Sequence, residues 1–165
     1  MIYFPGSTIG NFDHQEALAF LKRMGRMARD RGAILIGVDL MKPVERLIAA
    51  YDDRGGKTAA FNLNLLQRLQ RELEADLDLD DFAHEARFND VERRIEMHLV
   101  AQRSTSIQLG RQRFDFDAGQ SIHTENSYKY SVDDFQDMAR KAKLRPVMVW
   151  QDPEELFSMH WLEVA

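Results

Sequence analysis

The chain of 165 residues has no cysteine, which excludes a disulfide framework, a thiolate metal site and a cysteine nucleophile. It has no apolar run approaching the ~20 residues of a membrane-spanning helix and no secretory signal, so we expect a soluble, cytoplasmic protein. It also has no surplus of basic residues: 22 Lys and Arg stand against 27 Asp and Glu, for a formal net charge of −5. These absences argue against nucleic-acid or membrane partners and favour a small molecule.

Metal-binding motifs are missing as well. The five histidines show no spacing of the H-E-x-x-H kind, and the acidic clusters at residues 72–76 and 78–81 lack the D-x-D-x-D-G pattern of a calcium loop. We therefore predict no metal site. The acidic clusters are expected to be a solvated helix end followed by a capped turn.

The first forty residues have the pattern of a β-α-β unit. A short apolar segment over residues 1–4 and a turn at 5–7 precede helical spacing that starts at the capping residue Asp13 and ends at Gly32. Residues 33–40 then form a near-continuous apolar run. Unbroken apolarity is typical of a strand in a parallel sheet that is covered on both faces.

The middle of the chain changes character. Residues 44–50 and 60–73 have helical spacing, and alternating segments predict antiparallel strands over residues 84–88, 93–102, 106–109, 114–117 and 121–125. The end returns to α/β patterning, with a helix capped by Ser131 and two strands over residues 145–151 and 157–164. We therefore expect an α/β protein in which residues 41–129 form an inserted α+β subdomain.

One run is specific enough to indicate a family. Phe4-Pro-Gly-Ser-Thr-Ile-Gly-Asn-Phe12 resembles the F-x-G-S-x-x-G-N-F signature of histidine Nα-methyltransferases, enzymes that use S-adenosylmethionine (SAM) to trimethylate free histidine on the route to ergothioneine. Further segments resemble the family in the same order along the chain: residues 37–42, 49–53, 58–64, 94–97 and 124–129. The resemblance covers nearly the whole chain.

This resemblance implies a fold and a cofactor. Residues 1–40 and 130–165 would be the C-terminal part of a class I (Rossmann-like) methyltransferase sheet, and residues 41–129 would be the inserted substrate-binding subdomain. The family's glycine-rich loop for SAM lies upstream of the segments matched here, and no G-x-G-type loop occurs in this sequence. We therefore expect the isolated chain to bind SAM weakly and to be inactive.

The resemblance also implies which residues bind substrate. Asn11 and Tyr51 would bind the carboxylate of the amino acid, Met97 would pack on the imidazole face, and Glu125 and Ser127 would contact the two ring nitrogens. Without the family match, Asn11 would be an ordinary turn residue, and Tyr51 and Met97 would be packing residues. Because Glu125 and Ser127 are two apart on an extended segment, they would point to the same side.

The turn after the first strand is the other part of the predicted site. Gly6 would allow close backbone approach to the substrate or to SAM, and Ser7 would add a polar group on the SAM side, although Pro5-Gly6 is equally an ordinary turn. Methyl transfer is an in-line displacement in which positioning of the amine does most of the work. No catalytic nucleophile is therefore predicted.

Three hypotheses remain open at this stage. The first is a fragment of an enzyme that methylates the α-amine of L-histidine. The second keeps the fold and reaction but takes another aromatic amino acid, such as a tryptophan derivative. The third is a catalytically incompetent half-subunit or binding module, because an unpaired apolar strand at a sheet edge favours homo-oligomerisation or a complementing N-terminal half.

Overall fold

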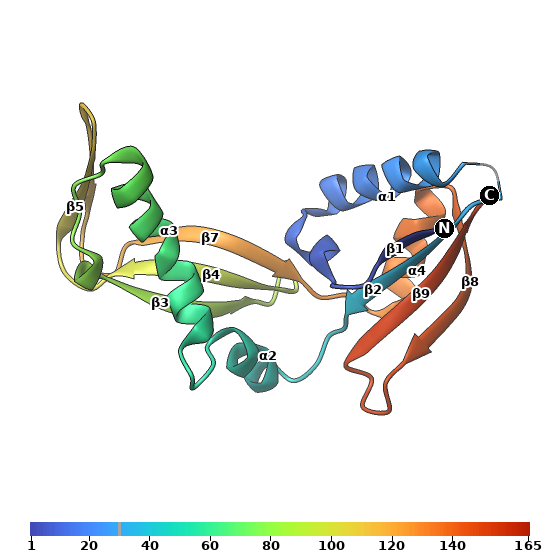
Figure 1. Ribbon diagram of the computed structural model, residues 1–165. Coiled ribbons are helices and arrows are strands. Elements are labelled where there is room, and N and C mark those ends of the chain that lie inside the picture. The colour runs from blue at the N-terminus through green and yellow to red at the C-terminus, as the bar shows by residue number, and fades with distance from the viewer. Residues whose placement is uncertain (30) are drawn as a thin grey trace. The chain divides into compact units, whose positions relative to one another are not determined.

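A computed structural model describes residues 1–29 and 31–165 as two compact units (Figure 1). Unit 1 comprises Met1–Pro43, Asp90–Arg94 and Asn126–Ala165, and unit 2 comprises Val44–Asn89 and Ile95–Glu125. The expected division gave the whole of residues 41–129 to the insert. In the structure, residues 41–43, 90–94 and 126–129 belong to unit 1.

Unit 1 is built on a four-stranded mixed sheet. Its strand order is β1-β2-β9-β8, with these bounds: Ile2–Phe4, Ala33–Asp39, Phe157–Val164 and Leu144–Gln151. β1 and β2 are parallel, whereas β9 is antiparallel to both β2 and β8. The sheet therefore combines a parallel pair of strands with an antiparallel C-terminal hairpin.

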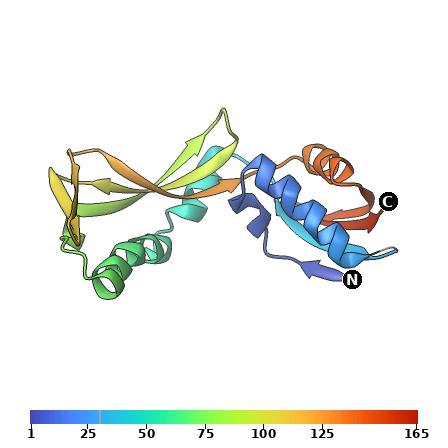
Figure 2. The ribbon, with the colours of Figure 1, turned by 90° about the horizontal axis from the view of Figure 1, so that it is seen from above.

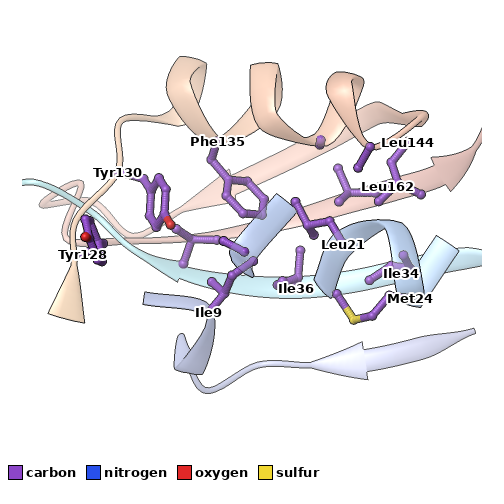
Figure 3. Close-up of a cluster of buried hydrophobic side chains, with 14 residues drawn as sticks. Ile9, Leu21, Met24, Ile34, Ile36, Tyr128, Tyr130, Phe135, Leu144 and Leu162 are labelled. Atoms are coloured by element: carbon purple, nitrogen blue, oxygen red, sulfur yellow. The ribbon is translucent and has the colours of Figure 1, made fainter. Parts of the chain in front are cut away.

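Two amphipathic helices cover one face of this sheet. α1 (His14–Ala28) begins with a capping box, in which Asp13 accepts from the backbone of Glu16 while the Glu16 carboxylate accepts from the backbone of Asp13. α4 (Val132–Lys141) is capped by Ser131. The helices contact each other and the sheet, and Phe135, Leu21 and Ile36 are fully buried between them (Figures 2 and 3).

The opposite face of the same sheet is apolar but half-exposed. Strand register places Tyr3, Leu35, Trp161 and Met148 in one row across all four strands. Tyr3 is 62% exposed and Met148 is 52% exposed. The expectation that β2 is covered on both faces is therefore wrong for the part of the chain that the structure describes, because both of its helices lie on one side. We call this row, together with Trp150, the outer sheet face.

Unit 2 combines two helices with a sheet and a hairpin (Figure 1). Its helices are α2 (Val44–Tyr51) and α3 (Lys57–Leu73). Its strands are ordered β3-β4-β7 in one sheet and β5-β6 in the other, with these bounds: Phe82–Asn89, Arg94–Ala101, Ser121–Tyr128, Thr105–Leu109 and Gln112–Phe116. Leu66 of α3 and Leu99 of β4 lie in its hydrophobic core.

Two details differ from the expected pattern, and a third agrees with it. α3 starts at Lys57, three residues early, because the Asp53 carboxylate accepts from the backbone of Lys57 and Thr58. β7 continues to Tyr128 rather than ending at residue 125. The expected capped turn is present: Asp78 caps a 3-10 turn, Leu79–Asp81, in which Asp81 is buried and its carboxylate contacts Thr105 and Arg103.

Candidate functional site

The segment that carries the family signature, residues 5–12, is called the signature loop. It follows β1 at the carboxyl edge of the two parallel strands, where open α/β sheets bind ligands. Its 3-10 turn, Thr8–Asn11, leads into α1. Ser7 adopts the left-handed backbone conformation (φ 54°), and its Oγ accepts from the backbone N–H of Asp39 at 2.7 Å. The hydroxyl therefore joins the end of β1 to the end of β2.

Two glycines allow this loop to sit where it does. A Cβ on Gly10 would lie 2.9 Å from the carbonyl oxygen of Tyr128, and one on Gly37 would lie 2.1 Å from the carbonyl oxygen of Pro5. Both contacts are with backbone, which has little room to move. Gly10 and Gly37 are therefore required for close packing, and neither contributes a functional group.

A buried ammonium group connects the loop to β7. The side chain of Lys129 is 0% exposed, and its Nζ lies 2.7 Å from Oδ2 of Asp39 and donates to Oγ of Ser127 at 2.8 Å. Lys42 contacts the other carboxylate oxygen of Asp39 at 2.6 Å. Ser7, Asp39, Lys129 and Ser127 thus form one connected chain, which we call the lysine network. This network fixes the position of Ser127 relative to the signature loop.

Aromatic rings lie on both sides of Lys129. Tyr128 stacks at a tilt on His14, with ring centroids 4.9 Å apart, and its hydroxyl accepts from Arg94. Tyr130 is 2% exposed, and burial raises the pKa of its phenol well above the ordinary range. The phenol of Tyr130 therefore stays protonated near neutral pH.

In unit 2, Tyr51 lies at the C-terminal end of α2. A series of hydrogen bonds between uncharged groups connects this helix end to the sheet. The amide nitrogen of Asn62 donates both to Nδ1 of His84 at 2.9 Å and to the carbonyl of His98 at 3.1 Å. Because Nδ1 of His84 accepts, its Nε2 carries the hydrogen and donates to the carbonyl of Tyr51 at 2.8 Å. We call this the asparagine relay.

Met97 and Glu125 lie on neighbouring strands of the same unit. Met97 is buried, and its backbone carbonyl accepts a hydrogen bond from Thr124 Oγ1 at 3.0 Å. Thr124 immediately precedes Glu125 in the chain. Glu125 is half-buried, and its own carbonyl faces Nε2 of His123 at 3.2 Å. The pairing of β4 with β7 thus places these two predicted substrate residues on neighbouring strands.

The structure groups the predicted residues by unit. Ser7 and Ser127 are joined by the lysine network, with Gly6 and the exposed Asn11 on the same loop as Ser7. Tyr51, Met97 and Glu125 belong to unit 2. Sequence reasoning missed the residues that hold them: Asp39, Lys129, Asn62 and His84. Asp39, Lys129 and Asn62 lie inside segments that resemble the family, which was the available signal, whereas His84 lies outside all of them.

Comparison with known proteins decides the family. A family model described as "Histidine-specific methyltransferase, SAM-dependent" matches residues 1–164. The chain belongs to this family. The resemblance predicted from the signature loop is therefore confirmed, and SAM is the methyl donor that the family uses.

Two mycobacterial relatives agree with this assignment. The chain is 41% identical to the histidine N-alpha-methyltransferase of Mycobacterium tuberculosis over 92% of its own length and 48% of the relative's. It is 38% identical to the histidine N-alpha-methyltransferase of Mycolicibacterium smegmatis over 96% of its length and 50% of the relative's. The chain thus spans about half the length of these curated relatives, consistent with the expected C-terminal half.

Solved structures support the fold class. A SAM-dependent methyltransferase from Clostridium acetobutylicum superposes with a TM-score of 0.52 at 12% identity, covering 99% of this chain and 57% of that one. The CcbJ methyltransferase of Streptomyces caelestis gives a TM-score of 0.50 at 10% identity, covering 99% and 59%. The predicted class I, Rossmann-like α/β fold is confirmed. No helix among residues 1–29 and 31–165 is long and apolar enough to cross a bilayer.

The residues present fit one side of a SAM site. Gly6 is exposed at the carboxyl edge of the parallel strands, and a Cβ there would meet only Thr8 Oγ1 at 3.7 Å, so a ligand can approach its backbone. Ser7 is fixed beside it by Asp39. In the part of the chain described, the glycines with positive φ are Gly56, Gly110 and Gly119, and none follows β1 or β2. If SAM binds at this edge, the exposed backbone at Gly6 and the fixed Ser7 are the groups of this loop that would meet it.

Proposed function

We propose that this chain forms the substrate-binding half of a SAM-dependent methyltransferase acting on the α-amine of L-histidine. One observation carries the proposal: the lysine network joins the signature loop to Ser127 through a fully buried cation. A buried ammonium is costly unless it is paired, so such a network is maintained where it fixes a functional arrangement. Residues 41–129 are proposed to act as the inserted substrate-binding subdomain.

The roles of the residues follow from their chemistry. SAM would supply an electrophilic methyl group, and the chain would hold the amine of histidine in line with it. Asn11 would donate to the substrate carboxylate, with Tyr51 adding a phenol donor. Glu125 would accept from an imidazole N–H. Since Lys129 donates to Ser127 Oγ, the Ser127 hydroxyl would in turn donate to the other ring nitrogen. Met97 would pack on the ring.

A chimera tests the activity directly. We would replace the matched half of the M. smegmatis relative with this chain and measure methylated histidine by mass spectrometry in the presence of SAM. The chimera should methylate histidine, and the chain alone should not. A folded, SAM-binding chimera without histidine methylation would contradict the proposal, as would robust turnover by the chain alone.

The choice of histidine over another aromatic amino acid depends on Glu125. In the chimera, Glu125→Ala should weaken histidine binding by about 1.5–3 kcal/mol, roughly tenfold to hundredfold, through loss of a charge-assisted hydrogen bond. Asn11→Ala should weaken histidine and tryptophan alike, because it would contact the common carboxylate. Calorimetry would measure the affinity of each variant for histidine and for tryptophan. If Glu125→Ala weakened the binding of both amino acids equally, Glu125 would not bind the imidazole, and the alternative substrate would be favoured.

A second proposal concerns a partner chain, and the outer sheet face favours it. Tyr3, Leu35, Trp161 and Met148 form an apolar row that the helices of unit 1 leave half-exposed, and β1 is the edge strand of the sheet. We propose that a polypeptide supplying the other half of the relatives' length covers this face. Light scattering of the chain alone and mixed with that half of the M. smegmatis relative tests this. A 1:1 complex supports the proposal, whereas a homodimer that excludes the added half, or a monomer in both samples, overturns it.

A further inference from the structure

The strand pairing of unit 2 brings together two histidines and a glutamate from different segments. Glu96 and His98 are two residues apart on β4, so they share a face of the strand, and His123 lies on the neighbouring strand β7. The rings of His98 and His123 are stacked, with centroids 4.7 Å apart. One ligand atom from each of the three residues lies within 4.8 Å of the others.

We propose that Glu96, His98 and His123 form a binding site for a divalent transition-metal ion, with Zn²⁺ as the ion best matched to the ligands. Two imidazoles and a carboxylate are a ligand set that zinc takes in proteins, and three protein ligands leave a fourth position for water or another group. The site goes beyond the proposed methyl transfer, which needs no metal. Motif spacing could not reveal it, because its members come from two strands.

One pair of ligand atoms in the cluster already has the spacing that a bound ion requires. Ligand atoms on one tetrahedral zinc ion are about 3.3 Å apart. Nε2 of His98 and Oε2 of Glu96 are already 3.2 Å apart. His123 is exposed, so its ring can turn toward the ion without disturbing the core. Binding would therefore require the His123 ring to turn from the carbonyl of Glu125 toward the pair formed by Glu96 and His98.

Two of the three ligands are also oriented by a group outside the trio, as metal ligands usually are. Ser121 Oγ lies 3.0 Å from Nδ1 of His98, and a hydroxyl can accept from that nitrogen when Nε2 binds an ion. Asn89 donates to Oε1 of Glu96 at 2.9 Å, which leaves Oε2 facing His98. These contacts hold the ligand atoms toward one point.

The charges around the cluster are compatible with a cation. Arg87 on β3 is the nearby positive charge, and it is already paired with Glu85 at 2.8 Å. Glu96 supplies the net negative charge of the cluster.

Titration of the metal-free chain with Zn²⁺ tests the site. The chain, prepared without an oligohistidine tag and stripped with a chelator, should bind one equivalent of zinc by calorimetry, and Co²⁺ should give the visible absorption of tetrahedral nitrogen ligation. His123→Gln and Glu96→Gln should each weaken zinc binding at least about tenfold. Both side chains lie at or near the surface, and circular dichroism would verify folding.

His14→Gln is the matched control, because His14 is an exposed histidine of unit 1 outside the cluster. It should bind zinc as the unchanged chain does. The proposal is overturned if the chain shows no saturable zinc binding, or if folded His123→Gln and Glu96→Gln bind zinc with unchanged affinity.

Discussion

The two units hold their candidate site residues by different kinds of interaction. In unit 1, Ser127 and the signature loop are held by an ionic network centred on the fully buried Lys129. In unit 2, the helix end that carries Tyr51 is held by the neutral asparagine relay. A broken ionic network leaves an uncompensated charge in a poorly solvated place, whereas a broken neutral relay leaves only unpaired donors and acceptors. The two units should therefore differ in how strongly substitutions affect them.

Lys129→Met should have the largest effect. It removes the buried cation while Asp39 keeps only its contact with Lys42, so the free energy of unfolding should fall by about 3–5 kcal/mol. Denaturant titration measures this loss, with the exposed Lys22→Met as the matched control. A change in unfolding free energy below about 1 kcal/mol is typical of an exposed ion pair. It would show that the ion pair of Lys129 does not stabilise unit 1 in the way proposed.

The next effect is pH-dependent and also belongs to unit 1. His160 is fully buried against Phe135, and burial lowers its pKa from 6.5 to about 4. Because the folded state binds this proton less readily than the unfolded state, stability is complete above pH 6.5 and is lost as the pH falls through 4. The loss should reach about 3 kcal/mol.

His160→Gln isolates this contribution. The difference in unfolding free energy between the chain and this variant should change across the window from pH 6.5 to 4 and stay level above it. A constant difference across that window would mean that His160 does not titrate on unfolding as its burial implies.

Asn62→Ala tests the neutral relay of unit 2. It leaves Nδ1 of His84 and the carbonyl of His98 without their amide donor, so we expect a loss of about 1–3 kcal/mol, smaller than that of Lys129→Met. Asn64→Ala on the exposed side of the same helix is the control. If Asn62→Ala proved as costly as Lys129→Met, the contrast between the two units would disappear.

The smallest effect is expected at the start of α3. Hydrogen bonds from the backbone and side chain of Thr58, and then from the backbone of Lys57, lower the pKa of Asp53 from 3.8 to about 2. This contribution is present above pH 3.8 and is lost as the pH falls toward 2. Asp53→Asn should flatten that part of the acid-unfolding curve, followed by helical circular dichroism, and an unchanged curve would refute the capping role.

Local patterns predicted most elements, because helices and strands differ in the spacing of their apolar residues. They could not predict pairings between distant segments. Asp39 and Lys129 belong to segments whose family resemblance was clear, yet only the fold shows that they meet in an ion pair. The capped turn at residues 78–81 could be predicted, but the ion pair and hydrogen bond of Asp81 could not, because its partners, Arg103 and Thr105, come from a later turn and strand.

The candidate site shows the same division. Gly6, Ser7 and Asn11 could be proposed from one contiguous run, and the structure adds that Ser7 is fixed by the backbone of Asp39. The pairing of Asn62 with His84 could not be proposed, since neither an asparagine on a helix nor a histidine on a strand indicates its partner until the fold brings the two together. The exposure of the outer sheet face could not be predicted for a related reason. An apolar strand sequence does not indicate on which face of the sheet the helices of the chain will pack.

The close contact between Gly10 and the carbonyl of Tyr128 affects how mutational screens of this family should be interpreted. Any side chain at this position would displace the loop, so a scan scored by product formation alone would rank Gly10 beside residues that touch the substrate. Scoring the same library for the amount of folded protein would separate the two groups. Gly10 should lose both signals, whereas Glu125 should lose activity and keep abundance.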